Sequence, residues 1–436
     1  MADKRFDVAI LGASGFTGQQ AVRALVRQTA NAPLRWAVAG RNPEKLRKVV
    51  ADKVPAGVVQ PDVVSVDATD LDALASLAAA TRVLLNLAGP YALTGESVVQ
   101  ACIANGAHYL DLSGETFWVR QLIARHHRAA ERAGVKIIAC CGYESLPFDL
   151  ATLWAARALR DRYGAPAREV KIIVSFTGKR ITRIADALSG GTVASLQMML
   201  EHDRTDSVRN AACLLPDADS AQAKITARRN AVRFVPQFDE DVRAVTAPTV
   251  PAPFVNPPIV LRSVALMNDA TLFASDFSYH EATNMASLVP ATSLLPGVAT
   301  LPLQWAAAAS LAAPLANLSA AVAGPLGFER EPLRKLVDWL APHSGEGPTE
   351  AALAGMGYAF DVFAGTAKEQ RWRGRVEAQG HPGYRSTPEM VVAAALGLAS
   401  GTLGQTPHHG VVTPATGLGI EAVDALGAAG VRYFEA

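Results

Sequence analysis

Three glycines spaced three residues apart stand near the start of the chain, in the segment 8–18 with the sequence VAILGASGFTG. The apolar residues before Gly12 predict a short buried strand, and apolar residues at helical spacing after Gly18 predict a helix. A strand, a glycine turn and a helix in this order bind nucleotide phosphates, because the first N–H groups of the helix face the anion. Gly15 would let a pyrophosphate approach the backbone. We therefore predict a nucleotide cofactor that is bound by Gly12, Ser14, Gly15, Phe16, Thr17 and Gly18.

The ends of the next two predicted strands indicate which nucleotide this is. The strand predicted over 34–39 leads into Arg41. An acid at this place suits the ribose hydroxyls of NAD, whereas an arginine matches the 2′-phosphate of NADP. Arg41 therefore favours NADP(H); the alternative is an exposed residue at a helix start. The strand predicted over 63–66 ends in Asp67, where such folds often hold adenine.

A turn with the sequence NLAGPY follows the strand predicted over 83–87. In a doubly wound sheet, the reactive end of the cofactor lies at the carboxyl end of a central strand. We expect this turn to contact the nicotinamide through Asn86, Gly89 and Pro90.

Hydride transfer to an alkene or an imine also needs a proton donor within hydrogen-bond reach. Five polar residues near strand ends qualify by type: Tyr91, Ser113, Glu115, Tyr143 and Glu144. We select Tyr143, Tyr91 and Glu144 as the catalytic residues, with either tyrosine as the proton donor or as a hydroxyl that orients the substrate. The alternatives are turn tyrosines bonded to the backbone and glutamates, at 115 and 144, that cap helices. No tyrosine has a lysine four residues later, which disfavours the Tyr-x-x-x-Lys chemistry of short-chain dehydrogenases.

The order of the predicted elements indicates an α/β fold. Strands and helices alternate over residues 1–150, which predicts a Rossmann-type doubly wound parallel sheet. Longer β-branched strands are predicted over 170–177, 271–281, 358–365 and 372–379, the last two forming a hairpin, and a helix is predicted over 192–202. We expect an α+β substrate and dimerisation domain with a mixed or antiparallel sheet over 151–385. Residues 386–436 are expected to form helices that pack back on the first domain.

The segment 282–328 contains no charged residue. Its five prolines predict that no run approaches the roughly 20 residues that span a bilayer. It suits a buried or dimer-interface helical pair, and the alternative is an apolar lid or a membrane-facing patch for a lipid-like substrate.

The composition of the chain limits the kinds of molecule that we expect it to bind. The formal charge of +1 gives no electrostatic basis for binding nucleic acid. The four cysteines lack metal-ligand spacing, so we expect reduced core residues and no metal. The charged N-terminus runs directly into the first strand and leaves no room for a signal peptide, so we expect a cytoplasmic protein with possible peripheral membrane contact.

Several motifs together resemble the saccharopine dehydrogenase-like oxidoreductase family, and within it the trans-acting enoyl reductases. They are GASGFTG at 12–18, AGR at 39–41, GPY at 89–91, YLDLSGE at 109–115 and CGYESLPFDL at 141–150. The resemblance implies a Rossmann domain that binds NADP(H), and hydride-transfer chemistry. Where related families have Phe-Asp-Ser, this chain has Tyr143-Glu144-Ser145. We find no arginine set for the two carboxylates of a saccharopine-type substrate, which counts against a literal lysine-pathway role.

The sequence therefore favours an NADP-dependent oxidoreductase that reduces a C=C bond of an acyl or polyketide-type substrate offered by a carrier. A C=N reductase that acts on an amino-acid adduct is the alternative enzyme. A non-catalytic NADP-binding redox sensor and a lipid-surface protein with a structural nucleotide are alternatives of other classes. We expect a homodimer.

Overall fold

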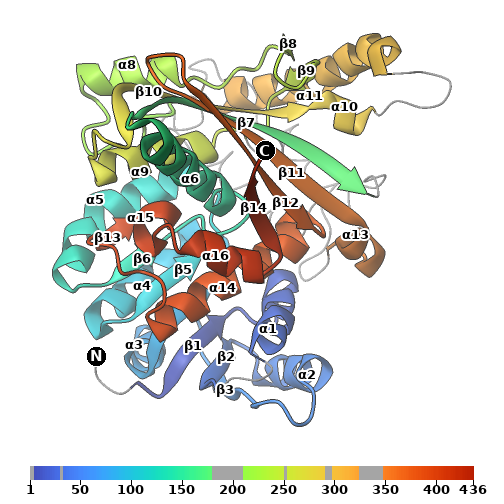
Figure 1. Cartoon of the computed structure of the whole chain (residues 1–436). Helices are drawn as coiled ribbons and strands as arrows, with labels where there is room; N and C mark the ends of the chain where they lie inside the picture. Colours follow the sequence, from blue (N-terminus) through green and yellow to red (C-terminus); the bar gives the residue numbers. More distant parts are fainter. Residues whose placement is uncertain (1–3, 30–32, 179–209, 250–252, 290–296, 324–346) are drawn as a thin grey trace.

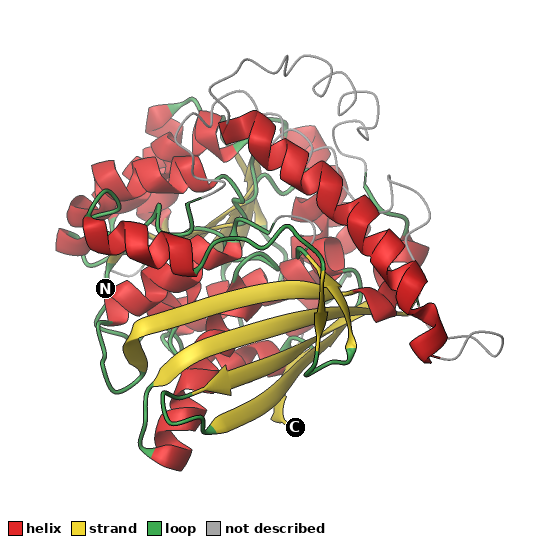
Figure 2. Ribbon diagram, turned by 90° about the horizontal axis from the view of Figure 1, so that it is seen from above, coloured by secondary structure: helices red, strands yellow, loops and turns green. Residues whose placement is uncertain are grey.

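The computed structural model describes residues 4–29, 33–178, 210–249, 253–289, 297–323 and 347–436. The described residues form two sheets with helices around them (Figures 1 and 2). The helix predicted over 192–202 lies outside the described residues.

The first sheet is parallel throughout, with the order β13-β6-β5-β4-β1-β2-β3. Its strands are β1 (Phe6–Leu11), β2 (Trp36–Gly40), β3 (Asp62–Ser65), β4 (Thr81–Asn86), β5 (His108–Asp111), β6 (Lys136–Ile138) and β13 (Gly410–Val412). The connecting helices are α1 (Phe16–Gln28), α2 (Pro43–Lys53), α3 (Leu71–Ala80), α4 (Tyr91–Asn105) and α5 (Thr116–Arg132). The predicted Rossmann-type sheet is confirmed. Its chain order reverses between β1 and β4, which is where such sheets bind nucleotides.

Local sequence sets where the helices of this sheet begin. Asn42 caps α2 by accepting a hydrogen bond from the Lys45 N–H at 3.0 Å. Asp70 caps α3 in the same way, from the Ala73 N–H at 3.0 Å. Such caps stabilise a helix by about 1 kcal/mol. In contrast, the N-cap residue of α1 is Gly15, which has no side chain to cap the helix.

The second sheet is mixed, with the order β14-β12-β11-β7-β10-β9-β8. Its strands are β7 (Ala167–Gly178), β8 (Gln237–Asp239), β9 (Ala244–Ala247), β10 (Phe273–Asn284), β11 (Met356–Gly365), β12 (Arg371–Gln379) and β14 (Val431–Glu435). Among the described strands of this sheet, only β7 and β10 pair in parallel, and β11 and β12 form the predicted antiparallel hairpin. The mixed sheet agrees with the predicted fold class. One face of it packs on α6 (Leu146–Tyr163), which follows the first domain in the chain.

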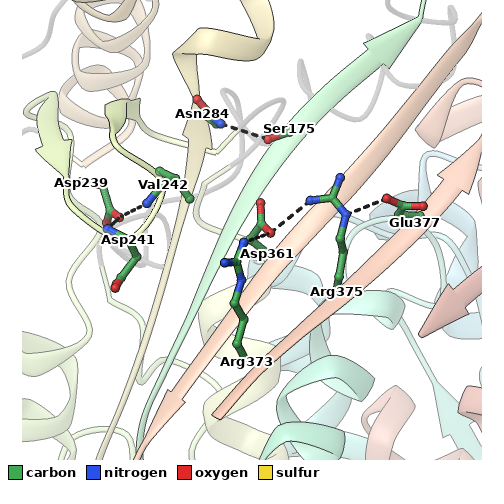
Figure 3. Close-up of polar contacts among 9 residues, drawn as sticks. All are labelled: Ser175, Asp239, Asp241, Val242, Asn284, Asp361, Arg373, Arg375 and Glu377. Atoms are coloured by element: carbon green, nitrogen blue, oxygen red, sulfur yellow. Dashed lines mark hydrogen bonds and ion pairs between the residues drawn. The ribbon is translucent and has the colours of Figure 1, made fainter. Parts of the chain in front are cut away.

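The other face of the second sheet carries charged side chains (Figure 3). Asp361 on β11 accepts hydrogen bonds from Arg373 at 2.9 Å and from Arg375 at 3.1 Å, both on β12. Arg375 also donates to Glu377 at 2.6 Å. Alternation along the strands therefore places apolar residues toward α6 and ion pairs on the opposite face.

The C-terminal segment joins both sheets. Helix α14 (Thr387–Ser400) packs on α1, β1 and β4, while β13 extends the first sheet and β14 extends the second. The helices α15 (Pro414–Leu418) and α16 (Ala422–Ala428) lie between those strands in the chain. Sequence patterning predicted helices here and not the two short strands, because three to five residues are too few to show a clear period.

The uncharged segment 282–328 is partly described. It begins in β10, continues in α10 (Met285–Leu288) and the 3-10 turn 297–300, and then forms α11 (Leu301–Ala323). The prolines do not break it as predicted, because α11 runs through Pro314 over 23 residues. A proline removes one hydrogen bond of a helix and bends it, which a helix can survive. Among the described residues, no helix has both the length and the apolar character needed to cross a membrane.

Candidate active site

The turn between β1 and α1 has the geometry of a phosphate-binding turn. Gly12 adopts a φ of +84°, and a Cβ there would lie 2.7 Å from the carbonyl carbon of Leu87. A Cβ at Gly18 would lie 2.2 Å from the carbonyl oxygen of Gly12. The first glycine therefore lets this turn touch the turn after β4, and the third lets α1 begin directly against β1.

Gly15 is different, because neither its backbone nor the packing around it requires glycine. Its φ of −70° and ψ of 166° suit any residue. Among the described residues, a Cβ there would meet only the Gly12 carbonyl oxygen, at 3.4 Å. The remaining reason for a glycine at the uncapped start of α1 is the close approach of a ligand, so this turn fits the pyrophosphate of a dinucleotide.

The neighbours of these glycines contribute in different ways. The ring of Phe16 packs edge-on against the ring of Tyr384, with centroids 5.7 Å apart. Its side chain is therefore part of the contact with the C-terminal half. Ser14 and Thr17 lie in the same turn and first helical turn, and both are half-buried.

Arg41 and Asp67 lie near each other at the ends of neighbouring strands. Arg41 is exposed immediately after β2. Asp67 accepts hydrogen bonds from the N–H and the hydroxyl of Thr69 at 2.9 and 2.8 Å, and these lower its pKa, as does the charge of Arg41. The pair is placed where the adenosine end of the cofactor lies in such sheets.

The turn after β4 is held from inside by Asn86. Its Oδ1 accepts from the Ala88 N–H at 3.0 Å, and its Nδ2 donates to the Tyr109 hydroxyl at 3.1 Å. The Asn86 side chain is fully buried in these contacts, so it supports the turn and does not face a ligand. Gly89 and Pro90, joined by a cis peptide, form the part of the turn next to α4.

Sequence reasoning did not find the buried network behind this turn. The Asp111 carboxylate accepts from the Tyr109 hydroxyl at 2.8 Å and from the N–H groups of Ser113 and Cys140 at 2.9 and 3.1 Å. Burial raises the pKa of Asp111 to about 7, although these hydrogen bonds oppose the shift. Asp111 therefore fixes the loops after β5 and β6 to each other, at the same edge of the sheet as the glycine turn.

The side chains of Tyr91 and Glu115 also make their contacts with other parts of the protein. Glu115 accepts from the N–H groups of Tyr91 and Ala92 at 3.1 and 2.8 Å, so it caps α4. Helix capping was the alternative role for Glu115, and the helix that it caps is α4, not α5, which follows it in the chain. The Tyr91 ring stacks on Trp118 at 5.9 Å, and burial raises the pKa of its phenol well above 10.

Tyr143 and Glu144 lie in the loop between β6 and α6. The Tyr143 ring contacts Tyr358 on β11 and Phe148 on α6 edge-on, with centroids 5.0 and 5.5 Å apart, and so joins the loop after β6 to the second sheet. Its hydroxyl is buried with no hydrogen-bond partner among the described residues. Burial raises its pKa well above 10, as do the nearby carboxylates of Glu144 and Glu281. Glu144 is half-buried beside it.

Glu281 on β10 is the second residue that sequence reasoning missed. Tyr279 donates to its Oε2 at 2.6 Å, and Asn256 donates to the same oxygen at 3.0 Å. Burial raises the pKa of Glu281 to about 7, partly offset by these hydrogen bonds. The available signal was the run Tyr279, Glu281, Thr283, which places polar groups on every second residue of a strand and hence on one face.

The parallel sheet, its glycine turn and the polar groups at its carboxyl edge define a nucleotide-dependent oxidoreductase. Residues 8–138 match the family model described as the saccharopine dehydrogenase NADP binding domain. A trans-acting enoyl reductase of Mycobacterium leprae (strain TN) is 30% identical over 450 residues, covering 98% of this chain and 97% of that one. One of Mycobacterium tuberculosis (strain ATCC 25618 / H37Rv) is 29% identical over 446 residues, with 99% and 97% covered.

The chain belongs to the saccharopine dehydrogenase-like oxidoreductases, among the trans-acting enoyl reductases. It is an NADP-dependent oxidoreductase, and its cofactor is NADP(H). Among solved structures, the apo saccharopine dehydrogenase (L-Glu forming) of Saccharomyces cerevisiae covers 98% of this chain and 99% of that one, at 14% identity and a TM-score of 0.49.

Proposed function

We propose that this protein transfers a hydride from NADPH to the C=C bond of an acyl or polyketide-type substrate. The full-length similarity to proteins named trans-acting enoyl reductases is the observation that carries this proposal. The absence of a Tyr-x-x-x-Lys pair from the sequence supports it, since reduction of an isolated carbonyl commonly uses that pair.

We propose further that the cofactor lies across the carboxyl edge of the first sheet. Its pyrophosphate would lie at the turn of Gly12, Gly15 and Gly18. The 2′-phosphate would contact Arg41, with Asp67 near the adenine. The nicotinamide would lie by Gly89 and Pro90. When bound, NADPH supplies the hydride, and the chain supplies the binding edge and the groups that hold the substrate.

Cofactor preference is the first test. Fluorescence titration with NADPH and NADH should show tighter binding of NADPH. Arg41→Ala should weaken NADPH binding at least about tenfold, since a charge-assisted contact with phosphate contributes about 1.5–3 kcal/mol, and should leave NADH binding unchanged. Arg47→Ala is the matched control, because Arg47 is exposed on the adjacent helix α2. Equal weakening of both cofactors by Arg41→Ala would contradict the assignment of the 2′-phosphate.

Substrate class is the second test. NADPH oxidation should be followed with a panel of trans-2-enoyl thioesters, offered both as coenzyme A esters and on an acyl carrier, and with a panel of cyclic imines. Turnover of enoyl thioesters alone supports the proposal. Turnover of imines alone would replace it with the C=N reductase.

A further inference from the structure

Glu281 lies in a group of polar side chains that three segments of the chain bring together. Tyr279 neighbours it on β10, Asn256 begins α9 (Asn256–Met267), and Tyr143 comes from the loop after β6. We call these four residues the Glu281 cluster. Tyr279 and Asn256 both donate hydrogen bonds to the carboxyl group, so its position is fixed.

Four buried polar atoms in and beside the Glu281 cluster have no hydrogen-bond partner among the described residues. They are the Tyr143 hydroxyl, Asn256 Oδ1 and the hydroxyls of Thr249 and Thr283. Thr283 follows Glu281 by two residues and so shares its face of β10. Buried polar atoms in folded proteins are nearly always paired, and an unpaired one costs about 1–3 kcal/mol. Their gathering around one carboxyl group indicates a site for the polar part of a ligand.

The Glu281 cluster borders the edge of the first sheet where the cofactor binds. Tyr143 belongs to the loop after β6. Val255, which precedes Asn256, packs on the loop after β5, since a Cβ at Gly114 would lie 3.8 Å from Val255 Cγ2. Tyr143 and Asn256 are buried, whereas Glu281 retains intermediate exposure. The surrounding protein therefore shields the carboxyl group, although the residue as a whole keeps some exposure.

We propose that Glu281 is the general acid of the reduction and that the Tyr143 hydroxyl donates a hydrogen bond to the carbonyl oxygen of the substrate. This inference rests on the proposed function. Tyr279 and Asn256 are positioning residues, because they act by holding the carboxyl group of Glu281.

The proposed step balances as follows. The β-carbon of the enoyl substrate gains a C–H bond with the hydride that NADPH supplies, and NADP⁺ remains. The π electrons of the C=C bond move onto the carbonyl oxygen, and the Tyr143 hydroxyl stabilises this enolate. The O–H bond of Glu281 then breaks, and its proton forms the C–H bond at the α-carbon. The carboxylate regains a proton from water, so the cycle consumes one NADPH and one proton.

Two groups in the Glu281 cluster could supply that proton, and their acidities differ. A general acid works best when its pKa is near the operating pH. Burial raises the pKa of Glu281 to about 7, whereas the pKa of the Tyr143 phenol is raised well above 10. Glu281 therefore suits proton transfer, and Tyr143 suits hydrogen bonding. Of the two roles expected for Tyr143, this division keeps the hydroxyl that orients the substrate, and it assigns the proton donor to Glu281.

The test compares wild type, Glu281→Gln and Tyr143→Phe with an enoyl thioester that the wild type reduces. Wild-type kcat should fall about tenfold per pH unit above pH 7, because the protonated carboxyl is the active form. Glu281→Gln should lose at least about 100-fold in kcat and lose this pH dependence, with the Kd for NADPH unchanged. Tyr143→Phe should lower kcat and keep the pH dependence. A Glu281→Gln variant with wild-type kcat or the wild-type pH profile would overturn the proposal.

Two further measurements distinguish a failure of the proposed general acid from a failure of the proposed function. Glu377→Gln, on the charged face of the second sheet, should retain wild-type kcat. If the wild type reduces no enoyl thioester, the proposed function fails, and infrared difference titration of the cofactor-free protein still tests the acid. Asp111 and Asp149 titrate in the same range in both proteins, so the readout is the difference between them: a carboxyl band that titrates near pH 7 in wild type in excess of Glu281→Gln supports the acid site. Identical titrations in the two proteins would overturn it.

Discussion

At the scale of single residues, the three glycines of the first turn are not equivalent. A side chain at Gly18 would overlap the Gly12 carbonyl. In contrast, a Cβ at Gly15 would lie 3.4 Å from the Gly12 carbonyl oxygen, which is an ordinary contact. We expect Gly15→Val to fold with a Tm close to that of wild type and to bind NADPH at least about tenfold more weakly, a loss of about 1.4 kcal/mol. Thermal unfolding and NADPH titration measure the two effects separately.

Gly18→Val is the matched variant for this prediction. Its Cβ would clash with backbone, so it should lose stability as well as binding. If Gly15→Val were as unstable as Gly18→Val, the glycine at 15 would serve packing, and the argument for a ligand at this position would be wrong.

Residue type and position in the sequence predicted which residues lie at the site better than they predicted what each residue does there. Asn86, Tyr91 and Glu115 lie at the predicted edge, but their polar atoms bond to the protein: Asn86 inside its own turn, Glu115 to the start of α4. Whether a side chain at a strand end turns inward or toward a ligand depends on partners far away in the chain. Single-sequence reasoning has no access to those partners.

At the scale of elements, one buried acid joins three helices. Asp149 on α6 accepts from the Ser263 hydroxyl of α9 at 2.6 Å and from the Ala415 N–H of α15 at 2.8 Å. Burial raises the pKa of Asp149 to about 7 from 3.8, with these hydrogen bonds opposing the shift. The folded protein therefore keeps a proton that the unfolded chain releases, and this contribution to stability is lost as pH rises from about 4 through 7.

We expect the stability of wild type relative to Asp149→Asn to fall over that range, by up to about 1.4 kcal/mol per pH unit for one proton. Urea unfolding of both proteins between pH 5 and pH 8 measures this difference. Asp161→Asn, at an exposed position on the same helix, should show no such trend. If the free energy of unfolding changed with pH in the same way for wild type and Asp149→Asn, Asp149 would have the same pKa in the folded and unfolded states.

Elements with strong periodicity were predictable, and those defined by tertiary contacts were not. The apolar runs of β1 and β4 and the caps at Asn42 and Asp70 are local signals, so the Rossmann half could be derived from the sequence. The strands β13 and β14 are three and five residues long and exist because a neighbouring strand accepts them. Glu281 was missed for a similar reason, since it belongs to no motif and gains its role from segments about 25 and 140 residues away.

At the scale of the whole molecule, the C-terminal segment couples the two sheets. Its strands β13 and β14 belong to different sheets although they are close in the chain. Tyr358 on β11 hydrogen-bonds Ser386, next to α14, at 2.8 Å, and Phe16 contacts Tyr384. Separation of the sheets would break all of these contacts, so we expect them to unfold together.

This coupling predicts how far the effect of cofactor binding extends. At a free NADPH concentration of 100 times Kd, the free energy of unfolding should rise by about 2.7 kcal/mol. Amides of β11 and β12 that exchange only on global unfolding should then slow about 100-fold, as much as those of β1 and β4, although NADPH binds at the first sheet. Hydrogen exchange with and without NADPH measures this slowing, and calorimetry should show a single unfolding transition. Arg41→Ala is the control: at the same NADPH concentration, its amides should slow less than those of wild type. Slowing confined to the first sheet, or two separate transitions, would mean that the sheets unfold independently and that the C-terminal segment does not couple them.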